Sequence, residues 1–304
     1  MNPALLAALL IWAAEVALVA ALTRTGAPAS ARRSAIALAL AALLAVFVVP
    51  AELILGRFAL ALLTLLALGR TLDLSLREHA LGYLGRVWLL VALFDVRRIR
   101  RGPPRFEPAE LGWLLAHVGL VIAGWLGVFE WAAGTQGLIR WSAGAVLCYA
   151  LVESTQSILL VLYAAFGVHP VRINLRPIVS TTLVEFWGRR WNRVVAGWLR
   201  DYAFFPLARR GRVGLGVAAA FGVSTAMHFW VSWAPLDLAA GLTMGSFFVV
   251  HAAALTLERK LGVARWPLGL RRTWTLVILL GSSPLFVEPM LRILAALIPD
   301  SSPW

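Results

Sequence analysis

Long apolar stretches dominate this chain and leave few folds open to it. Stretches of about 20 mostly apolar residues recur between residues 4 and 298, and short arginine-rich segments separate them. A helix of that length crosses the hydrocarbon core of a bilayer while satisfying its own backbone hydrogen bonds. Of the 304 residues, 61% are hydrophobic and only 14% are charged, far from the soluble norm of about 25%. The sequence therefore predicts an all-α, multi-pass integral membrane protein, with residues 1–304 forming a single domain.

The hydropathy pattern predicts eight or nine hydrophobic segments. Residues 4–22 form the first, and we expect it to be retained because no positively charged region precedes it. The others are 34–49, 58–68, 82–94, 111–128, 141–168, 213–234, 238–257 and 273–298.

The arginine-rich segments predict the orientation. By the positive-inside rule, 23–33, 95–105, 169–212 and 258–272 lie on the cytoplasmic side. An even number of crossings must separate the first two segments, whereas three apolar stretches lie between them. One of the three is therefore re-entrant or fused with a neighbour, and we assign the re-entrant role to 58–68, the shortest.

The charge and the cysteine content exclude several classes of function. The net charge is +13, but the arginines lie in short loops between apolar stretches, where membrane topology explains them. We therefore expect no nucleic-acid partner. The single cysteine, Cys148, excludes an intramolecular disulfide, a Cys-rich zinc site and an iron–sulfur cluster, and no bound metal or permanent cofactor is expected.

One polar segment, residues 177–207, combines a helical period with a cationic face. Thr182 and Glu185 have the spacing of a capping box, so we start a helix there and end it before Pro206. Such a helix would lie along the membrane interface. Its apolar face holds Leu183, Trp187, Trp191, Val194, Val195, Trp198 and Tyr202, and its cationic face holds Arg189, Arg190, Arg193 and Arg200.

The same segment resembles a known family. The run Ser180–Leu183 followed by Glu185–Asn192, with the core FWGRRWN, is similar to the hallmark of the wax synthase-like branch of the membrane-bound O-acyltransferases (MBOAT). In that family a histidine follows some tens of residues later in a hydrophobic helix, and His228 matches it. The resemblance implies an MBOAT-like fold, with the signature region at 177–234, and transfer of an acyl group from acyl-CoA. It also implies that Asn192 is an active-site residue.

His228 is the predicted general base. Ser224 and Thr225 precede it by four and three residues, so a polar stripe runs along an otherwise apolar helix and suggests a lined cavity. The alternative is a core histidine bonded to a neighbouring helix. For His251, in the next apolar segment, we favour a structural or tunnel-lining role over a shared metal site.

Other polar residues are candidates for binding. Asn192 could orient the thioester or donate to the oxyanion, or be only a surface amide. The arginines could grip the phosphates of coenzyme A, or serve only topology and lipid headgroups. Glu153 and Gln156 lie mid-segment, where they line a pocket or hold helices together. The candidate binding set is Trp187, Arg189, Arg190, Trp191, Arg193, Arg200, Ser224, Thr225, Glu153 and Gln156.

These features predict transfer of an acyl group, fatty in the first instance, from acyl-CoA to the hydroxyl of a lipophilic alcohol. One alternative is transfer of a short acyl group such as acetyl to a sterol, polyketide or saccharide hydroxyl. The other is a multi-pass transporter or lipid-binding membrane protein. The expected partners are membrane lipid, acyl-CoA and the alcohol. The expected location is the cytoplasmic membrane of a bacterium or the endoplasmic reticulum of a eukaryote.

Overall fold

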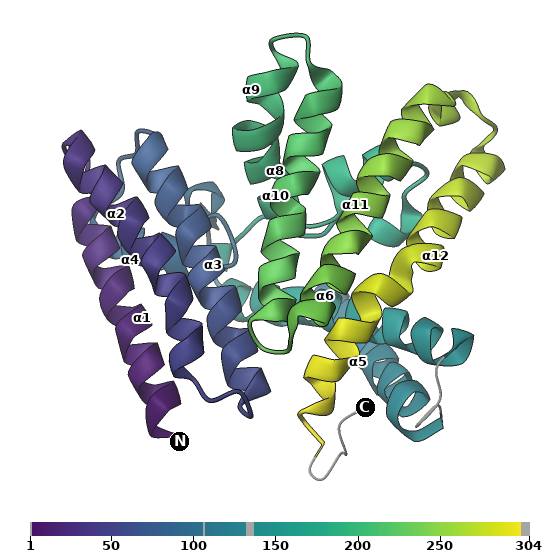
Figure 1. Ribbon diagram of the computed structural model, residues 1–304, viewed down its shortest axis with the longest axis horizontal. Helices are drawn as coiled ribbons and strands as arrows, with labels where there is room; N and C mark the ends of the chain where they lie inside the picture. Colours follow the sequence, from purple (N-terminus) through teal and green to yellow (C-terminus); the bar gives the residue numbers. More distant parts are fainter. Residues whose placement is uncertain (1, 106, 132–136, 299–304) are drawn as a thin grey trace. The chain divides into compact units, whose positions relative to one another are not determined.

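The computed structural model describes residues 2–105, 107–131 and 137–298, which fall into two compact units. The first unit holds the residues up to Arg97, Trp230–Gly241 and the segment from Ile293. The second holds Arg98–Phe229 and Leu242–Arg292. Figure 1 follows the chain by colour. The single integral domain expected from the sequence stays a prediction.

Eight helices of the described residues are long and apolar enough to cross a membrane. The all-α, multi-pass prediction is confirmed. They are α1 (Pro3–Leu22), α2 (Ala29–Ala42, continued by the 3-10 turn η1, Leu43–Val48), α3 (Ile54–Leu76), α5 (Pro108–Leu126, continued by the π turn η3, Gly127–Trp131), α6 (Leu138–Ala165), α10 (Val213–Trp233), α11 (Leu238–Lys260) and α12 (Leu268–Ala295).

Shorter elements connect them. They are α4 (Tyr83–Val91), η2 (Val96–Arg98), η4 (Pro177–Val179), α7 (Leu183–Glu185), η5 (Phe186–Arg190), α8 (Arg193–Leu199), η6 (Arg200–Phe204), α9 (Phe205–Ala208) and η7 (Val263–Arg265). Strands β1 (Arg100–Arg101) and β2 (Val168–His169) pair antiparallel, with Arg100 opposite His169.

The structure corrects the assignment of the re-entrant segment. Residues 58–68 lie inside α3, which is long enough to span, so that prediction was wrong. Hydropathy falls after Leu68 because Arg70 and Asp73 follow, yet both are buried, and Asp73 forms an ion pair with Arg97. The short element is instead α4, about 14 Å long at the helical rise and so well short of a bilayer core. With α2 and α3 crossing, the parity rule still holds.

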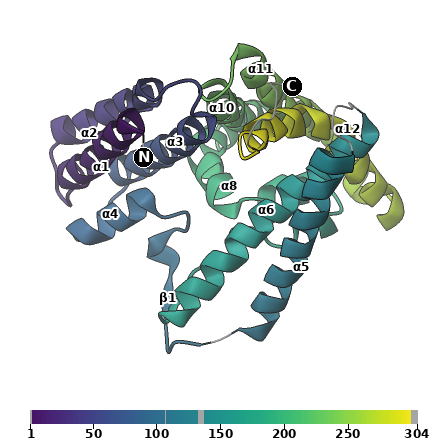
Figure 2. The same cartoon turned by 90° about the horizontal axis from the view of Figure 1, so that it is seen from below.

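In the first unit, helices α1, α2 and α3 lie side by side (Figures 1 and 2). Their shared core includes Ala8, Val46 and Leu60, all fully buried. Helix α4 is attached by the buried Arg86, whose Nε donates to the Ala20 carbonyl at 2.7 Å. An arginine inside an apolar unit is tolerated here because helix-terminal carbonyls accept its hydrogens.

In the second unit, helices α5 and α6 pack along much of their length (Figure 2). Small residues permit the close approach: a Cβ built on Gly124 would lie 2.9 Å from the Cβ of Leu147. Helix α6 also meets α12, where the fully buried Arg140 forms an ion pair with Glu288 at 3.1 Å. These contacts hold the frame against which the polar segment 169–212 is folded.

Candidate active site

The polar segment is not the single helix that its periodicity predicts. It contains α7, the π turn η5, a break at Trp191 and Asn192, then α8, the π turn η6 and α9. The continuous 182–205 helix was therefore wrong, and Pro206 does not end the segment, because it lies in the first turn of α9. The break arises at Asn192, whose backbone is left-handed with φ 35°, a conformation that asparagine tolerates better than most residues.

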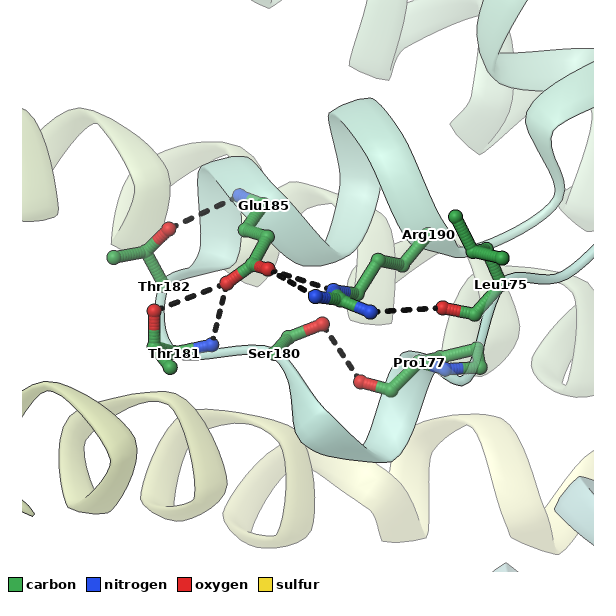
Figure 3. Close-up of polar contacts among 7 residues, drawn as sticks. All are labelled: Leu175, Pro177, Ser180, Thr181, Thr182, Glu185 and Arg190. Atoms are coloured by element: carbon green, nitrogen blue, oxygen red, sulfur yellow. Dashed lines mark hydrogen bonds and ion pairs between the residues drawn. The ribbon is translucent and has the colours of Figure 1, made fainter.

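The start of the segment matches the capping prediction in part. The Thr182 hydroxyl accepts the Glu185 N–H at 3.0 Å, as a capping box requires. The Glu185 carboxylate, however, bonds the backbone N–H and the hydroxyl of Thr181 rather than the N–H of Thr182 (Figure 3). The same carboxylate accepts Arg190 Nε at 2.7 Å, and Arg190 also donates to the Leu175 carbonyl. One carboxylate therefore ties both ends of the α7–η5 turn together.

Burial and hydrogen bonding shift the pKa of Glu185 in opposite directions. Partial burial would raise the pKa of this carboxyl, but the hydrogen bonds from Thr181 and Arg190 favour the ionised form and lower its pKa below the ordinary value. The carboxylate is thus the stable form at neutral pH. A second carboxylate, the buried Glu258 of α11, accepts the N–H groups of Leu183 and Val184 at 2.7 and 3.1 Å. Together they anchor the amino end of the segment.

The FWGRR sequence folds into the π turn η5. The Trp191 N–H donates to the Phe186 carbonyl five residues back, at 2.9 Å, and the Phe186 and Trp191 rings stack with centroids 5.6 Å apart. Single π turns of this kind often lie at functional sites. Here the turn directs Trp187, Gly188 and Trp191 into the wall of one cavity.

Asn192 is held from two sides. Its Oδ1 accepts the Val195 N–H at 3.2 Å and caps α8. Its own N–H donates to Oδ1 of Asn174 at 2.8 Å. Asn174 is fully buried, and its N–H donates to Gln156 Oε1 at 2.6 Å. Because no described residue bonds the Asn192 amide nitrogen, that donor is left for a ligand.

The polar belt of α6 therefore serves the segment through Asn174. Gln156 is buried and bonds the backbone of Asn174. Close by, Glu110 of α5 accepts the hydroxyl of Ser157 at 2.6 Å and forms an ion pair with Arg172. Of the two roles that the sequence allowed for this belt, these contacts support holding the structure together rather than lining a pocket.

A cavity of about 470 Å³ lies within the second unit, bounded by the signature segment, α10 and α11. This volume is in the range of small-molecule sites. Half of the predicted site residues line it: Trp187, Trp191, Asn192, Arg200, Ser224 and His228. The two polar residues with the strongest predictions, Asn192 and His228, thus face one space although 36 positions separate them in the chain.

The bonding of His228 fixes its tautomer. Its Nδ1 lies 2.8 Å from the Ser224 carbonyl, which can only accept, so Nδ1 carries the hydrogen. Nε2 is therefore an unprotonated acceptor, and no described residue bonds it. The ring stacks on Phe248 of α11, with centroids 3.9 Å apart and planes at 28°. A neutral imidazole with one free acceptor at a cavity wall has the form of a general base.

His251 is bonded at both nitrogens and fully buried. Trp187 Nε1–H donates to its Nδ1 at 3.1 Å, and its Nε2 lies 2.9 Å from the Ser282 hydroxyl. His251 lies outside the cavity lining and contacts Trp187, which lies in it. Of the two roles expected for His251, these contacts favour the structural role over the tunnel-lining role.

The remaining candidate residues lie outside the lining. Arg190 pairs with Glu185, and Arg193 donates to the Arg172 carbonyl at 3.4 Å. Arg189 is exposed. The Thr225 side chain lies toward Gly245 of α11, where a built Cβ would lie 3.3 Å from its methyl group.

Comparison with known proteins bears on the same residues. Residues 174–250, which include Asn174, Asn192, His228 and Phe248, match the model of the membrane bound O-acyl transferase family. The matched residues make up about a quarter of the chain and include the FWGRRWN core and His228. The resemblance in the FWGRRWN core is therefore confirmed.

Curated proteins similar to this chain come from Arabidopsis thaliana. The chain is 28% identical over 187 residues to "Probable long-chain-alcohol O-fatty-acyltransferase 1", covering 56% of this chain and 54% of that protein. It is 35% identical over 91 residues to "Acyl-CoA--sterol O-acyltransferase 1", covering 27% and 26%. The chain spans about half the length of the first relative and about a quarter of the second.

Three residues of the candidate site were missed by the sequence reasoning. Arg259 lines the cavity from the last turn of α11, but the sequence marks it only as a topology charge. Phe248 stacks on His228, and one aromatic in an apolar helix carries no signal. Asn174 precedes the FWGRRWN core in an irregular loop, so no periodicity could place it.

Proposed function

We propose that this protein transfers an acyl group from acyl-CoA to the hydroxyl of a lipophilic alcohol, with His228 as the general base. The observation that carries the proposal is that the signature segment and His228 line one cavity and that no described residue bonds His228 Nε2. The match of residues 174–250 to the family model and the names of the relatives support the reaction class. A long fatty chain is the first choice of acyl group because the lining is mainly aliphatic and aromatic.

The proposed reaction is direct transfer. His228 Nε2 takes the proton of the alcohol as its oxygen attacks the thioester carbonyl carbon. The carbon–sulfur bond then breaks, and the sulfur leaves with that proton as free coenzyme A thiol, so the imidazole returns to its neutral form. The Ser224 carbonyl keeps the hydrogen on Nδ1 and stabilises the charge while the ring is protonated.

Asn192 is proposed as the donor to the oxyanion. Its Oδ1 is already committed to the cap of α8, which turns the amide group in a fixed direction. The remaining N–H₂ group is the only part able to serve a substrate, and it can donate to the oxygen that becomes negative. A preorganised donor of this kind stabilises the transition state without moving during the reaction.

The cationic end of the cavity is proposed to hold the coenzyme. Along α10 the lining runs from Val213 to His228, about 22 Å at the helical rise. Arg259 lies at the end of α11, about 16 Å from Phe248 along that helix, and Arg200 lies in η6. Guanidinium groups match phosphate oxygens. Phosphates at this end and the thioester at His228 would fit one extended donor.

The class is tested by release of free thiol from palmitoyl-CoA by the purified protein in detergent, with and without hexadecanol. The expected result is release that depends on hexadecanol and is matched by hexadecyl palmitate. Acetyl-CoA with a sterol acceptor, run in parallel, tests the short-chain alternative. No release with any donor and acceptor, together with hexadecanol flux across sealed vesicles, would contradict the proposal and favour the transporter.

A further inference from the structure

The indole of Trp187 is held by one directional hydrogen bond. An indole N–H can only donate, so His251 Nδ1, 3.1 Å away, must present a lone pair to it. His251 is fully buried on α11, and the two rings meet nearly edge to face with an interplanar angle of 77°. A protonated His251, or its Nδ1–H tautomer, would lose this bond.

The other nitrogen of His251 completes a chain whose direction is fixed. The Ser282 hydroxyl lies 2.7 Å from the Ile278 carbonyl, an acceptor only, so its hydrogen points there. The Ser282 oxygen is then the acceptor for His251 Nε2–H at 2.9 Å. The order Trp187, His251, Ser282, Ile278 carbonyl has one consistent set of hydrogens, and it keeps His251 neutral.

Trp187, whose indole is fixed by the bond to His251, is also part of the cavity wall. Its ring lines the cavity and contacts Phe248, with centroids 5.7 Å apart. Phe248 in turn stacks on His228. The rings of Trp187, Phe248 and His228 thus contact one another in series along one wall. The Trp187 end of this series is fixed by a hydrogen bond to His251 as well as by packing.

We propose that His251 is a positioning residue, which orients Trp187 by accepting its indole hydrogen and, through Phe248, sets the plane of the His228 ring. The effect on catalysis rests on the proposed function; the orientation of Trp187 does not. His251 takes no proton from substrate, because both its nitrogens are engaged. Its contribution is to keep His228 Nε2 aimed at one point in the cavity.

The first test observes the bond itself. The indole ¹H–¹⁵N resonance of Trp187 is assigned in detergent-solubilised protein as the signal lost in Trp187→Phe. In His251→Leu it should move upfield because the acceptor is gone. In His251→Asn it should stay near its native position, because a carboxamide oxygen can replace Nδ1. An unmoved resonance in His251→Leu would overturn the proposal.

The chain of hydrogen bonds also predicts that a change at Ser282 alters the bond of Trp187. Ser282→Ala removes the acceptor of Nε2–H and so favours the tautomer that cannot receive the indole hydrogen. The Trp187 resonance should move in the same direction as in His251→Leu. Ser283→Ala is the matched control, because the adjacent Ser283 hydroxyl donates to the Leu280 carbonyl of its own helix at 2.7 Å and bonds neither histidine among the described residues. Equal effects from the two serines would contradict the proposal.

Kinetics then connect orientation to catalysis. His251→Leu should lower kcat about tenfold with a smaller change in KM, and His251→Asn should restore most of it. Combined with Trp187→Phe, His251→Leu should lower kcat no further than either change alone. Independent, multiplicative losses would contradict the positioning role. Absence of turnover in every variant and in the native protein would count against the proposed function only, because the resonance test needs no turnover.

Discussion

The two ends of the cavity are built for different tasks. At one end, His228 stacks on Phe248 and keeps Nε2 free, while its Nδ1 is bonded to a carbonyl of its own helix. At the other end, Arg259 is exposed in the last turn of α11, and Arg200 is exposed at the start of η6. One end orders a neutral ring in apolar surroundings, and the other offers cations to an anionic group. The chemical step and the capture of the donor should therefore be separable by mutation.

After His228, the residue with the largest predicted effect is Asn192. Asn192→Asp keeps the oxygen that caps α8 but loses the N–H₂ donor. We expect kcat to fall about 10²-fold or more, as for removal of an oxyanion donor, with the melting temperature little changed. Asn192→Gly is the matched variant that keeps the left-handed backbone and loses both groups. A kcat for Asn192→Asp equal to that of the native protein would remove Asn192 from the mechanism.

The cationic end should respond in KM. Arg259→Ala should raise the KM for palmitoyl-CoA about tenfold, because a charge-assisted bond to phosphate is lost, and should leave kcat nearly unchanged. Added salt should narrow the difference, since these side chains are exposed. Arg189→Ala serves as the control, because Arg189 is an exposed arginine of the FWGRRWN core that lies outside the cavity lining. Equal KM changes in both variants would indicate a general charge effect.

A substitution of Gln156 in α6 should disturb Asn192 indirectly, because Gln156 bonds Asn174 and Asn174 bonds Asn192. Gln156→Leu leaves the buried N–H of Asn174 without its acceptor, so we expect a loss of about 1–3 kcal/mol in the free energy of unfolding. Gln156→Glu keeps an oxygen at that position. In the leucine variant kcat should fall more than KM rises, because Asn174 holds Asn192 rather than the arginines. If Gln156→Leu changed only KM, the assignment of kcat to the Asn192 end and of KM to the arginine end would be contradicted.

The smallest effect concerns Glu185 and pH. Its pKa is lowered in the folded protein, so its contribution to stability is present at neutral pH and is lost as the pH falls through the ordinary carboxyl range. Glu185→Gln should cost about 1 kcal/mol near pH 7 and less at pH 4. Thermal melting across this range measures it. Glu107→Gln, which breaks a more exposed pair with Arg105, should cost less; the reverse order would contradict the assignment.

The sequence predicted the membrane class better than the local backbone. Hydropathy located the spanning segments because lipid demands long apolar helices, but it missed the buried polar end of α3, where Asp73 is paired from a distant loop. The stripe of Trp187, Trp191 and Trp198 suggested one helix. Its break at Asn192 depends on Asn174 and Gln156, which are distant in sequence, so no local pattern could reveal it.

The comparison of His228 with His251 shows the same limit. His228 was favoured by its match to the signature, and His251 was left with an open role. The two histidines differ in how many of their ring nitrogens are bonded. No described residue bonds Nε2 of His228. In His251, Trp187 bonds Nδ1 and Ser282 bonds Nε2. Sequence spacing carries no information about such cross-helix bonds.

The most direct measurement compares the native protein with His228→Ala in hexadecanol-dependent thiol release from palmitoyl-CoA, with thermal melting to show that both are folded. The account predicts a loss of about 10²- to 10⁴-fold in kcat for His228→Ala, the range for a missing general base, while His251→Asn retains most of its turnover. A folded His228→Ala protein that releases thiol at the native rate would contradict the account.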